Sequence, residues 1–318
     1  YKLDLIGKQA FYSCTSLAGD IQIGASKIGD SAFEGCNRIR GLDLNNAKEI
    51  GKRAFYGCTA ATSQLSLPDI EKIGESAFYN CSGLTSLKIT SSKLTEISNE
   101  AFYNCSGLTG EIDLACFDSG APTTKITKIG ESAFSGCSKI TKVILPNKLE
   151  TIGKSAFYNC TALVTVTSNS TGTDLYFPSG LKTISEKAFE NCSKLKGKVF
   201  IPNSVTRIKD LAFKGCTLLE GKTTQGVLYS SISETNPSAY NAWCIGMCGA
   251  TLTGDVVIKH PNSTEGNLIP IYGIAGGAFM NSTALANFSL AEAGEIKVID
   301  NYAFSGCTAL KQAGTSNV

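Results

Sequence analysis

One short pattern recurs along the chain and limits what it can fold into. The dipeptide Ala-Phe occurs eleven times, with an isoleucine five residues before every phenylalanine and a cysteine three residues after ten of them; the remaining copy has Ser282 there. Self-similarity at a short, nearly fixed period indicates stacked structural repeats. The phenylalanines are Phe11, Phe33, Phe55, Phe78, Phe102, Phe134, Phe157, Phe189, Phe213, Phe279 and Phe304.

Most units are 22 to 25 residues long, which lies in the range of leucine-rich repeats. Within one unit, Ala77, Cys81 and Leu84 recur at helical spacing and predict one or two turns of helix. Leu84, Leu87 and Ile89 then predict a short strand. No single unit can bury its apolar side alone. We therefore predict a repeat solenoid of about eleven coils, made mainly of β-strands with short helical turns.

Three intervals between phenylalanines are longer than the rest. Two intervals of 32 residues predict loops that project from one edge, near residues 116–124 and 168–176. The 66-residue interval between Phe213 and Phe279 contains several strand-like runs. Whether the coils on its two sides stay in register is left open. The predicted domains are a solenoid of nine repeats over residues 1–220, a β-rich insertion or atypical repeat over 221–273, and two further repeats over 274–318.

Composition excludes several classes of function. Lys plus Arg is 29 and Asp plus Glu is 27, so no excess positive charge favours a nucleic-acid partner. No apolar run approaches the roughly 18 residues of a membrane span, which predicts no membrane insertion in this segment. With one histidine, His260, a histidine-rich metal site is excluded.

The motif Ile-Gly-x-x-Ala-Phe-x-x-Cys-x-x-Leu resembles the BspA-type leucine-rich repeat, most clearly at residues 73–81 and 152–160. The resemblance covers nearly the whole chain, and the segment Tyr229–Ile274 is similar to β-rich units that accompany these repeats in some gut and oral bacterial proteins. It implies a secreted or surface-anchored bacterial protein that binds host proteins, other cells or glycans. The family's motifs define the scaffold and no ligand site. Five units replace the motif's glycine, by Ser98, Ser185, Lys209, Ala275 and Asp300.

The two ends of the chain fall inside the repeating pattern. The sequence opens at Tyr1 with no charged-then-apolar leader. We interpret it as a trimmed segment of a longer protein, so the missing leader says nothing about export.

Thirteen cysteines first suggest a disulfide framework. The ten repeat cysteines, however, occupy equivalent positions in stacked coils about 4.8 Å apart, wider than the roughly 3.8 Å that disulfide Cβ atoms prefer. We therefore predict buried thiols at Cys14, Cys36, Cys58, Cys81, Cys105, Cys137, Cys160, Cys192, Cys216 and Cys307. The state of Cys116 and a Cys244–Cys248 disulfide are left open, and a zinc site lacks a second ligand pair.

Five units carry tyrosine directly after the phenylalanine: Tyr12, Tyr56, Tyr79, Tyr103 and Tyr158. Three of these units are consecutive, which predicts a ladder of aromatic rings. Tyr56, Tyr79, Tyr103 and Tyr158 are a candidate ligand-contact stripe, because tyrosine offers apolar area with a polar tip. The alternative is that each ring only covers the next coil. We prefer it, since other units place Glu34, Glu190, Lys214 or Ser135 there.

Residues between the inward-facing strand positions form the outer side of the predicted sheet, the usual contact surface of a solenoid. They are mixed in charge and predict no ligand type: Asp43, Ser86, Lys88, Glu111, Asp113, Lys142, Lys198, Asn287 and Ser289. Glu111 and Asp113 are a pair of acids, but a flat strand lacks the cleft that would enclose a sugar for hydrolysis.

Two further motifs have structural explanations. Asn80-Cys81-Ser82 and three similar triplets match a glycosylation sequon, but we expect these asparagines to close the helical turns by bonding backbone. The other triplets begin at Asn104, Asn159 and Asn191. His260 lies in a turn-like context with no nucleophile beside it, and we expect a lone surface histidine.

The sequence thus favours a non-enzymatic, extracellular or cell-surface binding protein, adhesin-like, with no catalytic residue, cofactor or metal. Its partner would be a host or bacterial surface protein or glycan. The alternative is a structural spacer that holds another domain away from the cell surface.

Overall fold

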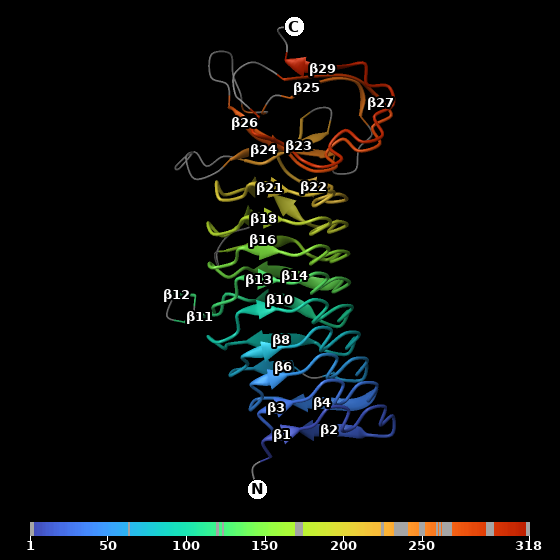
Figure 1. The fold of residues 1–318 in the computed structure, drawn as a ribbon, viewed down its shortest axis with the longest axis vertical. Coiled ribbons are helices and arrows are strands. Elements are labelled where there is room, and N and C mark those ends of the chain that lie inside the picture. Colours follow the sequence, from blue (N-terminus) through green and yellow to red (C-terminus); the bar gives the residue numbers. More distant parts are fainter. Residues whose placement is uncertain are drawn as a thin grey trace.

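The protein is a rod of stacked coils with its two termini at opposite ends, as a computed structural model shows (Figure 1). The structure describes residues 3–62, 64–118, 121–122, 124–168, 174–223, 226–231, 241–247, 252–258, 260, 262, 269–290 and 296–315. Each coil contributes a two-residue strand that ends at the repeat isoleucine, then a series of turns, then a second strand. Equivalent strands pair in parallel from coil to coil. The predicted repeat solenoid is confirmed.

The two-residue strands form one side of the rod, in two successive sheets. They are β1 (Leu5–Ile6), β3 (Lys27–Ile28), β5 (Glu49–Ile50), β7 (Lys72–Ile73), β9 (Glu96–Ile97), β13 (Lys128–Ile129), β15 (Thr151–Ile152), β18 (Thr183–Ile184) and β21 (Arg207–Ile208). Each isoleucine points into the core. The residue before it faces outward. From Lys27 to Lys128 these residues alternate in charge, and Nζ of Lys27 lies 2.8 Å from the Glu49 carboxylate.

The second strands form another side of the rod. They are β2 (Ala18–Gln22), β4 (Arg38–Asp43), β6 (Gln64–Leu67), β8 (Ser86–Ile89), β10 (Thr109–Asp113), β14 (Lys139–Ile144), β16 (Thr165–Thr167), β17 (Leu175–Tyr176), β19 (Lys196–Gly197), β20 (Val199–Phe200) and β22 (Leu218–Leu219). The side of these strands that faces away from the rod axis is the outer sheet face.

The predicted helical turns are wrong: the described residues contain no helix. Between β7 and β8 the chain instead makes successive turns, in which Ser76 and Asn80 adopt left-handed φ values of 54° and 61°. Right-handed helix needs negative φ at every residue. The N–H groups alternate in direction: Tyr79 bonds back to Ser76 (3.1 Å), whereas Phe78 donates to Ala101 in the next coil (2.8 Å). This alternation joins the coils through the turns as well as through the strands.

The left-handed positions explain the residues found two places after each phenylalanine. Every one of them has positive φ, and most are glycine or asparagine, the residues that tolerate this conformation best. The Asn191 side-chain amide donates to the Asn159 side chain at 3.0 Å. The Asn104 amide donates to Asn80 in the same way. The sequon asparagines therefore bond each other from coil to coil, rather than the backbone as predicted.

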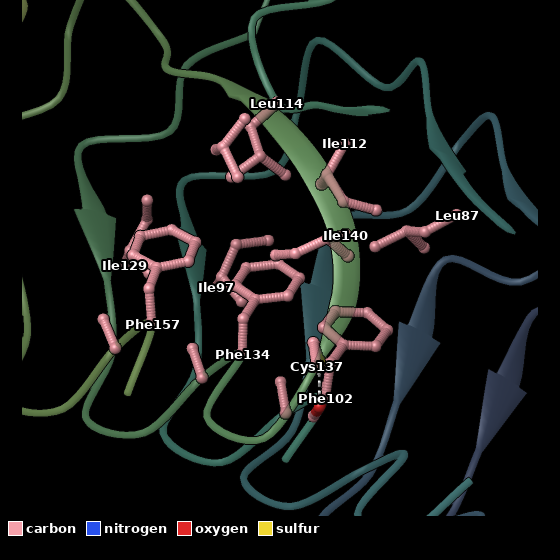
Figure 2. Close-up of a cluster of buried hydrophobic side chains, with 14 of the residues drawn as sticks. Leu87, Ile97, Phe102, Ile112, Leu114, Ile129, Phe134, Cys137, Ile140 and Phe157 are labelled. Carbon is pink, nitrogen blue, oxygen red and sulfur yellow. Dashed lines mark hydrogen bonds between the residues drawn. The ribbon is translucent and has the colours of Figure 1, made fainter. Parts of the chain in front are cut away.

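The core is a column of phenylalanine rings (Figure 2). From Phe11 to Phe213, neighbouring rings are stacked with centroids 4.9 to 5.6 Å apart. The rings from Phe33 to Phe213 are buried. Phe11 remains 40% exposed in the first coil, because no described coil covers its other face.

The repeat cysteines line the same core as thiols. Cys36, Cys58, Cys81, Cys105, Cys137, Cys160, Cys192 and Cys216 are buried. Each donates to the carbonyl oxygen of a phenylalanine in the preceding coil, as Cys137 does to Phe102 (3.2 Å). The predicted burial is wrong at the two ends of the ladder: Cys14 is exposed, because no described coil lies beneath it, and Cys307 is partly exposed.

The two predicted loop insertions differ in structure. The first carries a short antiparallel hairpin of β11 (Phe117–Asp118) and β12 (Ala121–Pro122), which projects from the side of the rod (Figure 1). The second ends in β17, which pairs with β16 on one side and β20 on the other. The prediction of a loop over residues 168–176 is therefore wrong at the end of this segment. There Leu175 is buried, and β17 adds a strand to the sheet. Residues 169–173 lie outside the described part.

The C-terminal strands, called here the C-terminal unit, complete the rod. They are β23 (Val227–Tyr229), β24 (Ala242–Met247), β25 (Thr253–Ile258), β26 (Ile271–Ile274), β27 (Ala284–Leu290), β28 (Val298–Ile299) and β29 (Gln312–Thr315). The segment predicted to be β-rich, 221–273, contains β23, β24 and β25. Strand β24 pairs antiparallel with β23 and parallel with β26.

Candidate ligand-binding surface

The candidate tyrosine stripe lies on the turns of the coils. The preceding phenylalanine in each unit points inward, so the tyrosine side chain points out of the core. Tyr56, Tyr79, Tyr103 and Tyr158 are all partly exposed. The stripe is therefore reachable from solvent, in contrast to the phenylalanine column behind it.

Three of the four tyrosines form a stacked ladder. The ring centroids of Tyr56 and Tyr79 lie 4.6 Å apart, and those of Tyr79 and Tyr103 lie 4.5 Å apart, with interplanar angles of 8° and 9°. Tyr158 is two coils beyond Tyr103. The buried Ser135 occupies the position between them. The structure thus brings together Tyr56, Tyr79 and Tyr103 and leaves Tyr158 apart.

An arginine closes one end of the ladder. The guanidinium carbon of Arg53 lies 3.7 Å from the centroid of the Tyr56 ring, a cation–π contact. Arg53 also donates two hydrogen bonds to the Glu34 carboxylate, at 3.0 and 2.5 Å. These bonds lower the pKa of the Glu34 carboxyl. Glu34 stands at the tyrosine position of its unit, whereas the sequence pattern did not single out Arg53, its partner in the next coil.

The stacking decides which part of each ring can meet a ligand. Both faces of Tyr79 are covered, by Tyr56 and by Tyr103. Burial, together with repulsion from Tyr103 and Tyr56, raises the pKa of the Tyr79 hydroxyl, so this group is protonated at neutral pH. The ladder can therefore offer ring edges and hydroxyl groups, and it cannot offer the inner ring faces.

The outer sheet face is the second candidate surface. The polar residues assigned to it from sequence are exposed or partly exposed, as expected. Lys142 and Glu111 form an ion pair there at 3.0 Å, and Asp113 accepts the backbone N–H of Ala115 at 2.9 Å. The two acids of the rejected glycosidase hypothesis are thus engaged separately, one in an ion pair and one in a turn.

One apolar feature of the outer sheet face was missed. The positions that follow Asp113 in register are Ile144, Thr167, Tyr176 and Phe200. The Tyr176 and Phe200 rings are stacked with centroids 4.4 Å apart. Ile144 and Phe200 are buried, yet neither belongs to the two hydrophobic cores. The sequence contained a signal for this feature. Two residues after the outward-facing Lys142 and Lys198, the strand positions that face the same side are apolar, Ile144 and Phe200.

His260 is buried, and the expectation of a surface histidine is wrong. It is 2% exposed, and its ring packs edge-on against Tyr229. Its Nδ1 accepts the Asn262 N–H (3.2 Å), and its Nε2 therefore carries the proton that bonds the Ser230 carbonyl (2.9 Å). Burial lowers the pKa of His260. The turn-like Lys-His-Pro-Asn context concealed this burial, which comes from strands distant in sequence.

Metal and membrane sites can be assessed over the described residues. No group of three or more His, Cys, Asp or Glu side chains there is arranged to hold a metal ion. No helix in that part of the chain could cross a membrane. Cys244 is buried, whereas Cys248, with which a disulfide was left open, lies outside the described residues.

Comparison with known proteins identifies the repeat. The chain matches the BspA type leucine rich repeat region in six copies, over residues 4–117, 119–227 and 270–317. A search of curated proteins found no match. Among solved structures, a leucine-rich repeat protein of T. pallidum is 30% identical, with 58% of this chain and 75% of that chain covered and a TM-score of 0.45.

Two further solved structures align over most of the chain. A leucine-rich cell surface protein of Faecalibacterium prausnitzii is 20% identical, with 92% of this chain and 84% of that chain covered and a TM-score of 0.44. A leucine-rich repeat protein of Bacteroides ovatus is 21% identical, with 98% and 82% covered and a TM-score of 0.45. The family match spans most of the sequence, and the coils repeat its motif in three dimensions. The protein belongs to the BspA-type leucine-rich-repeat family.

Proposed function

We propose that this protein is a non-enzymatic binding protein, secreted or held at a bacterial surface, that recognises a protein or glycan through the side of its solenoid. The observation that carries the proposal is the tyrosine ladder with its Arg53 end. In this ladder, three neighbouring coils present the same aromatic side chain to solvent, with an arginine stacked on the first ring. Tyrosine and arginine are enriched among the residues that dominate binding energy at interfaces.

The geometry narrows how a partner would contact the ladder. Because the inner ring faces are covered, a partner would bind the edges and hydroxyl groups of rings whose centroids recur every 4.5 to 4.6 Å. An extended polypeptide or a glycan chain running along the rod could meet several of these groups at once. The BspA-type leucine-rich repeats support the same proposal, because the surface of a stacked-repeat solenoid is the usual contact surface of such proteins.

The alternative function is a spacer, and one observation favours it. A single hydrophobic core runs from Ile6 through Leu219 and extends to four residues beyond it, Leu228, Trp243, Ile245 and Ala275. Repeats that are joined through such a core behave as a quasi-one-dimensional rod. A rod of this kind would hold a neighbouring domain at a fixed distance from its anchor.

The test is binding of the purified protein to an array of glycans, mucins and extracellular-matrix proteins. The test variant changes Tyr56, Tyr79 and Tyr103 to phenylalanine, which keeps the stack and removes the hydroxyl groups. A matched control changes Asp43 to Asn and Lys88 to Gln on the outer sheet face. We expect a saturable hit that the tyrosine variant weakens at least tenfold and the control leaves unchanged. Weakening by the control alone would move the site to the outer sheet face, and an array without any hit would favour the spacer.

A further inference from the structure

We propose that the C-terminal unit opens from the solenoid as a separate structural unit, and that the ion pair between Arg207 and Asp300 is the latch that holds it closed. The proposal does not depend on which ligand the protein binds. Three observations at the junction between the coils of Phe213 and Phe279 carry it.

The first observation is a break in the hydrogen bonds between turns. In the solenoid, each repeat phenylalanine donates its N–H to an alanine carbonyl of the next coil, as Phe189 does to Ala212 (2.8 Å). At the junction the corresponding carbonyl, that of Ala278, accepts the N–H of Met247 at 2.9 Å. Met247, at the end of β24, thus occupies the acceptor that the Phe213 N–H would use if the repeat continued. The junction keeps two bonds between turns, from Gly276 N–H to the Ile208 carbonyl (2.8 Å) and from Leu211 N–H to the Gly276 carbonyl (3.2 Å). On the side of the second strands, Ser231 and Asn241 also donate their N–H groups to carbonyls of the solenoid, at 2.7 and 3.0 Å.

The second observation is a break in the core. Phe213 stacks on Phe189 at 5.4 Å, and Phe279 stacks on Phe304 at 5.2 Å. Among the described residues no ring contact joins Phe213 to Phe279. A cavity of about 20 Å³ lies there instead, lined among others by Phe213 and Met247. Beyond the junction, most buried apolar residues belong to a second hydrophobic core, whereas Leu228, Trp243, Ile245 and Ala275 pack in the core of the solenoid. The break is therefore in the ring column and is only partial in the core as a whole.

The third observation is an ion pair that crosses this break. Arg207 in β21 donates to both carboxylate oxygens of Asp300, at 3.0 Å for the Nε–Oδ2 bond, although the residues are 93 positions apart. The Asp300 side chain is fully buried. By contrast, Lys128 and Glu96 pair within the solenoid with both side chains about half exposed. A buried carboxylate that loses its partner is strongly destabilising, whereas an exposed pair contributes little.

The repeat itself supplies substitutions that should fold. Thr151 and Thr183 occupy the position of Arg207 in the two preceding coils. Most units carry glycine at the position of Asp300. We therefore choose Arg207→Thr and Asp300→Gly as latch variants. The control, Lys128→Thr, makes the same kind of change in the same column inside the solenoid.

The experiment is native-state hydrogen exchange of the whole protein, resolved by mass spectrometry. In both latch variants we expect amides of β24 and β26 to exchange at least tenfold faster, with those of β9, β13 and β15 unchanged. Lys128→Thr should leave β24 and β26 at wild-type rates. Unchanged exchange in both latch variants would overturn the latch. Faster exchange that is uniform along the whole rod would show that the C-terminal unit does not open separately.

Discussion

The thiol of Cys137 donates a hydrogen bond to the carbonyl oxygen of Phe102, one coil earlier, across 3.2 Å (Figure 2). The same bond joins a cysteine and a phenylalanine at each step from Cys36 to Cys216. It links the two residues that define the repeat, so the sequence motif is also a contact between neighbouring coils. Several measurable properties depend on this contact and on the ring column beside it.

Removing a phenylalanine ring from the middle of the column should lower the stability of the fold. Phe102 is fully buried and stacks on Phe78 and Phe134 at 5.3 Å each. Phe102→Ala should lower the free energy of unfolding by about 3–5 kcal/mol, as for other buried aromatic side chains. Denaturant unfolding followed by circular dichroism measures it. A loss below about 1 kcal/mol would show that the column does not stabilise the rod.

Thiol reactivity should separate the ends of the cysteine ladder from its interior. The reagent needs an accessible thiolate, and burial raises the pKa of the Cys36 thiol to about 11. Alkylation of the native protein, located by peptide mass spectrometry, should modify Cys14 rapidly, because it is exposed. The eight buried thiols of the ladder, Cys36 to Cys216, should react only after denaturation. Rapid native labelling of Cys81 or Cys105 would contradict their burial.

Alkaline pH should destabilise the protein through the same thiols. Burial raises the pKa of the Cys137 thiol from 9.0 to about 12. Between these values the unfolded chain has released the proton and the native state has kept it, so stability falls as pH rises through this window. Each such thiol should cost about 1.4 kcal/mol per pH unit above 9.

A single substitution isolates this effect. Cys137→Ser removes one titrating thiol and keeps a small donor, as the repeat does at Ser282. Relative to wild type, this variant should gain about 1.4 kcal/mol of stability per unit between pH 9 and 11. Urea titrations at pH 8, 9, 10 and 11 give the difference. A difference that stays constant with pH would mean that the thiol ionises equally in both states.

Acidic pH should act through His260. Burial lowers the pKa of this histidine below its ordinary 6.5, and protonation of Nδ1 would break its bond with the Asn262 N–H. Below pH 6.5 the unfolded chain therefore binds a proton that the native state does not, and stability falls as pH falls. His260→Gln should lose this dependence. The unfolding free energies of wild type and variant, measured at pH 7.5 and 5.0, should therefore differ less at pH 5.0 than at pH 7.5. If both proteins lose the same stability between the two pH values, the pH effect comes from other groups.

The motif glycine should be required where the next coil packs against it. A Cβ built on Gly74 would lie 2.5 Å from the carbonyl carbon of Gly51. Gly74→Ala should therefore destabilise the protein by about 1–3 kcal/mol, as overpacking does. Gly24→Ala is the matched control, because nothing lies within 4 Å of its Cβ position. Thermal melts of both variants should differ, with Gly74→Ala the lower; equal melting temperatures would show that the coils can move apart at no cost.

Sequence periodicity by itself determined the column of phenylalanines, the isoleucine strands and the cysteine ladder, because each arises when identical units stack in one register. The stacking of Tyr56, Tyr79 and Tyr103 followed from the same reasoning, since consecutive units carry tyrosine at one position. A repeat of this kind leaves few other arrangements that bury its apolar side.

Local spacing was misleading where the backbone conformation depends on the neighbouring coil. Ala77, Cys81 and Leu84 recur at helical spacing, yet the N–H groups of Ser76, Phe78 and Asn80 bond to the next coil. Those bonds join two coils and require positive φ values at Ser76 and Asn80, which a right-handed helix excludes. Tertiary contacts replaced the local preference for a helix.

Only the tertiary structure decided what happens where units differ from the repeat. It placed β17 in the sheet, buried His260 beneath β23, and inserted the end of β24 between the coils of Phe213 and Phe279. It also paired Arg207 with Asp300 across 93 residues. The first three contacts involve segments that do not follow the repeat, and the Arg207–Asp300 pair joins two repeat units whose separation the sequence does not give. No pattern along the chain therefore encodes them. Stacking of identical units can be read from sequence, whereas the packing of a single irregular segment depends on the shape of the surface it meets.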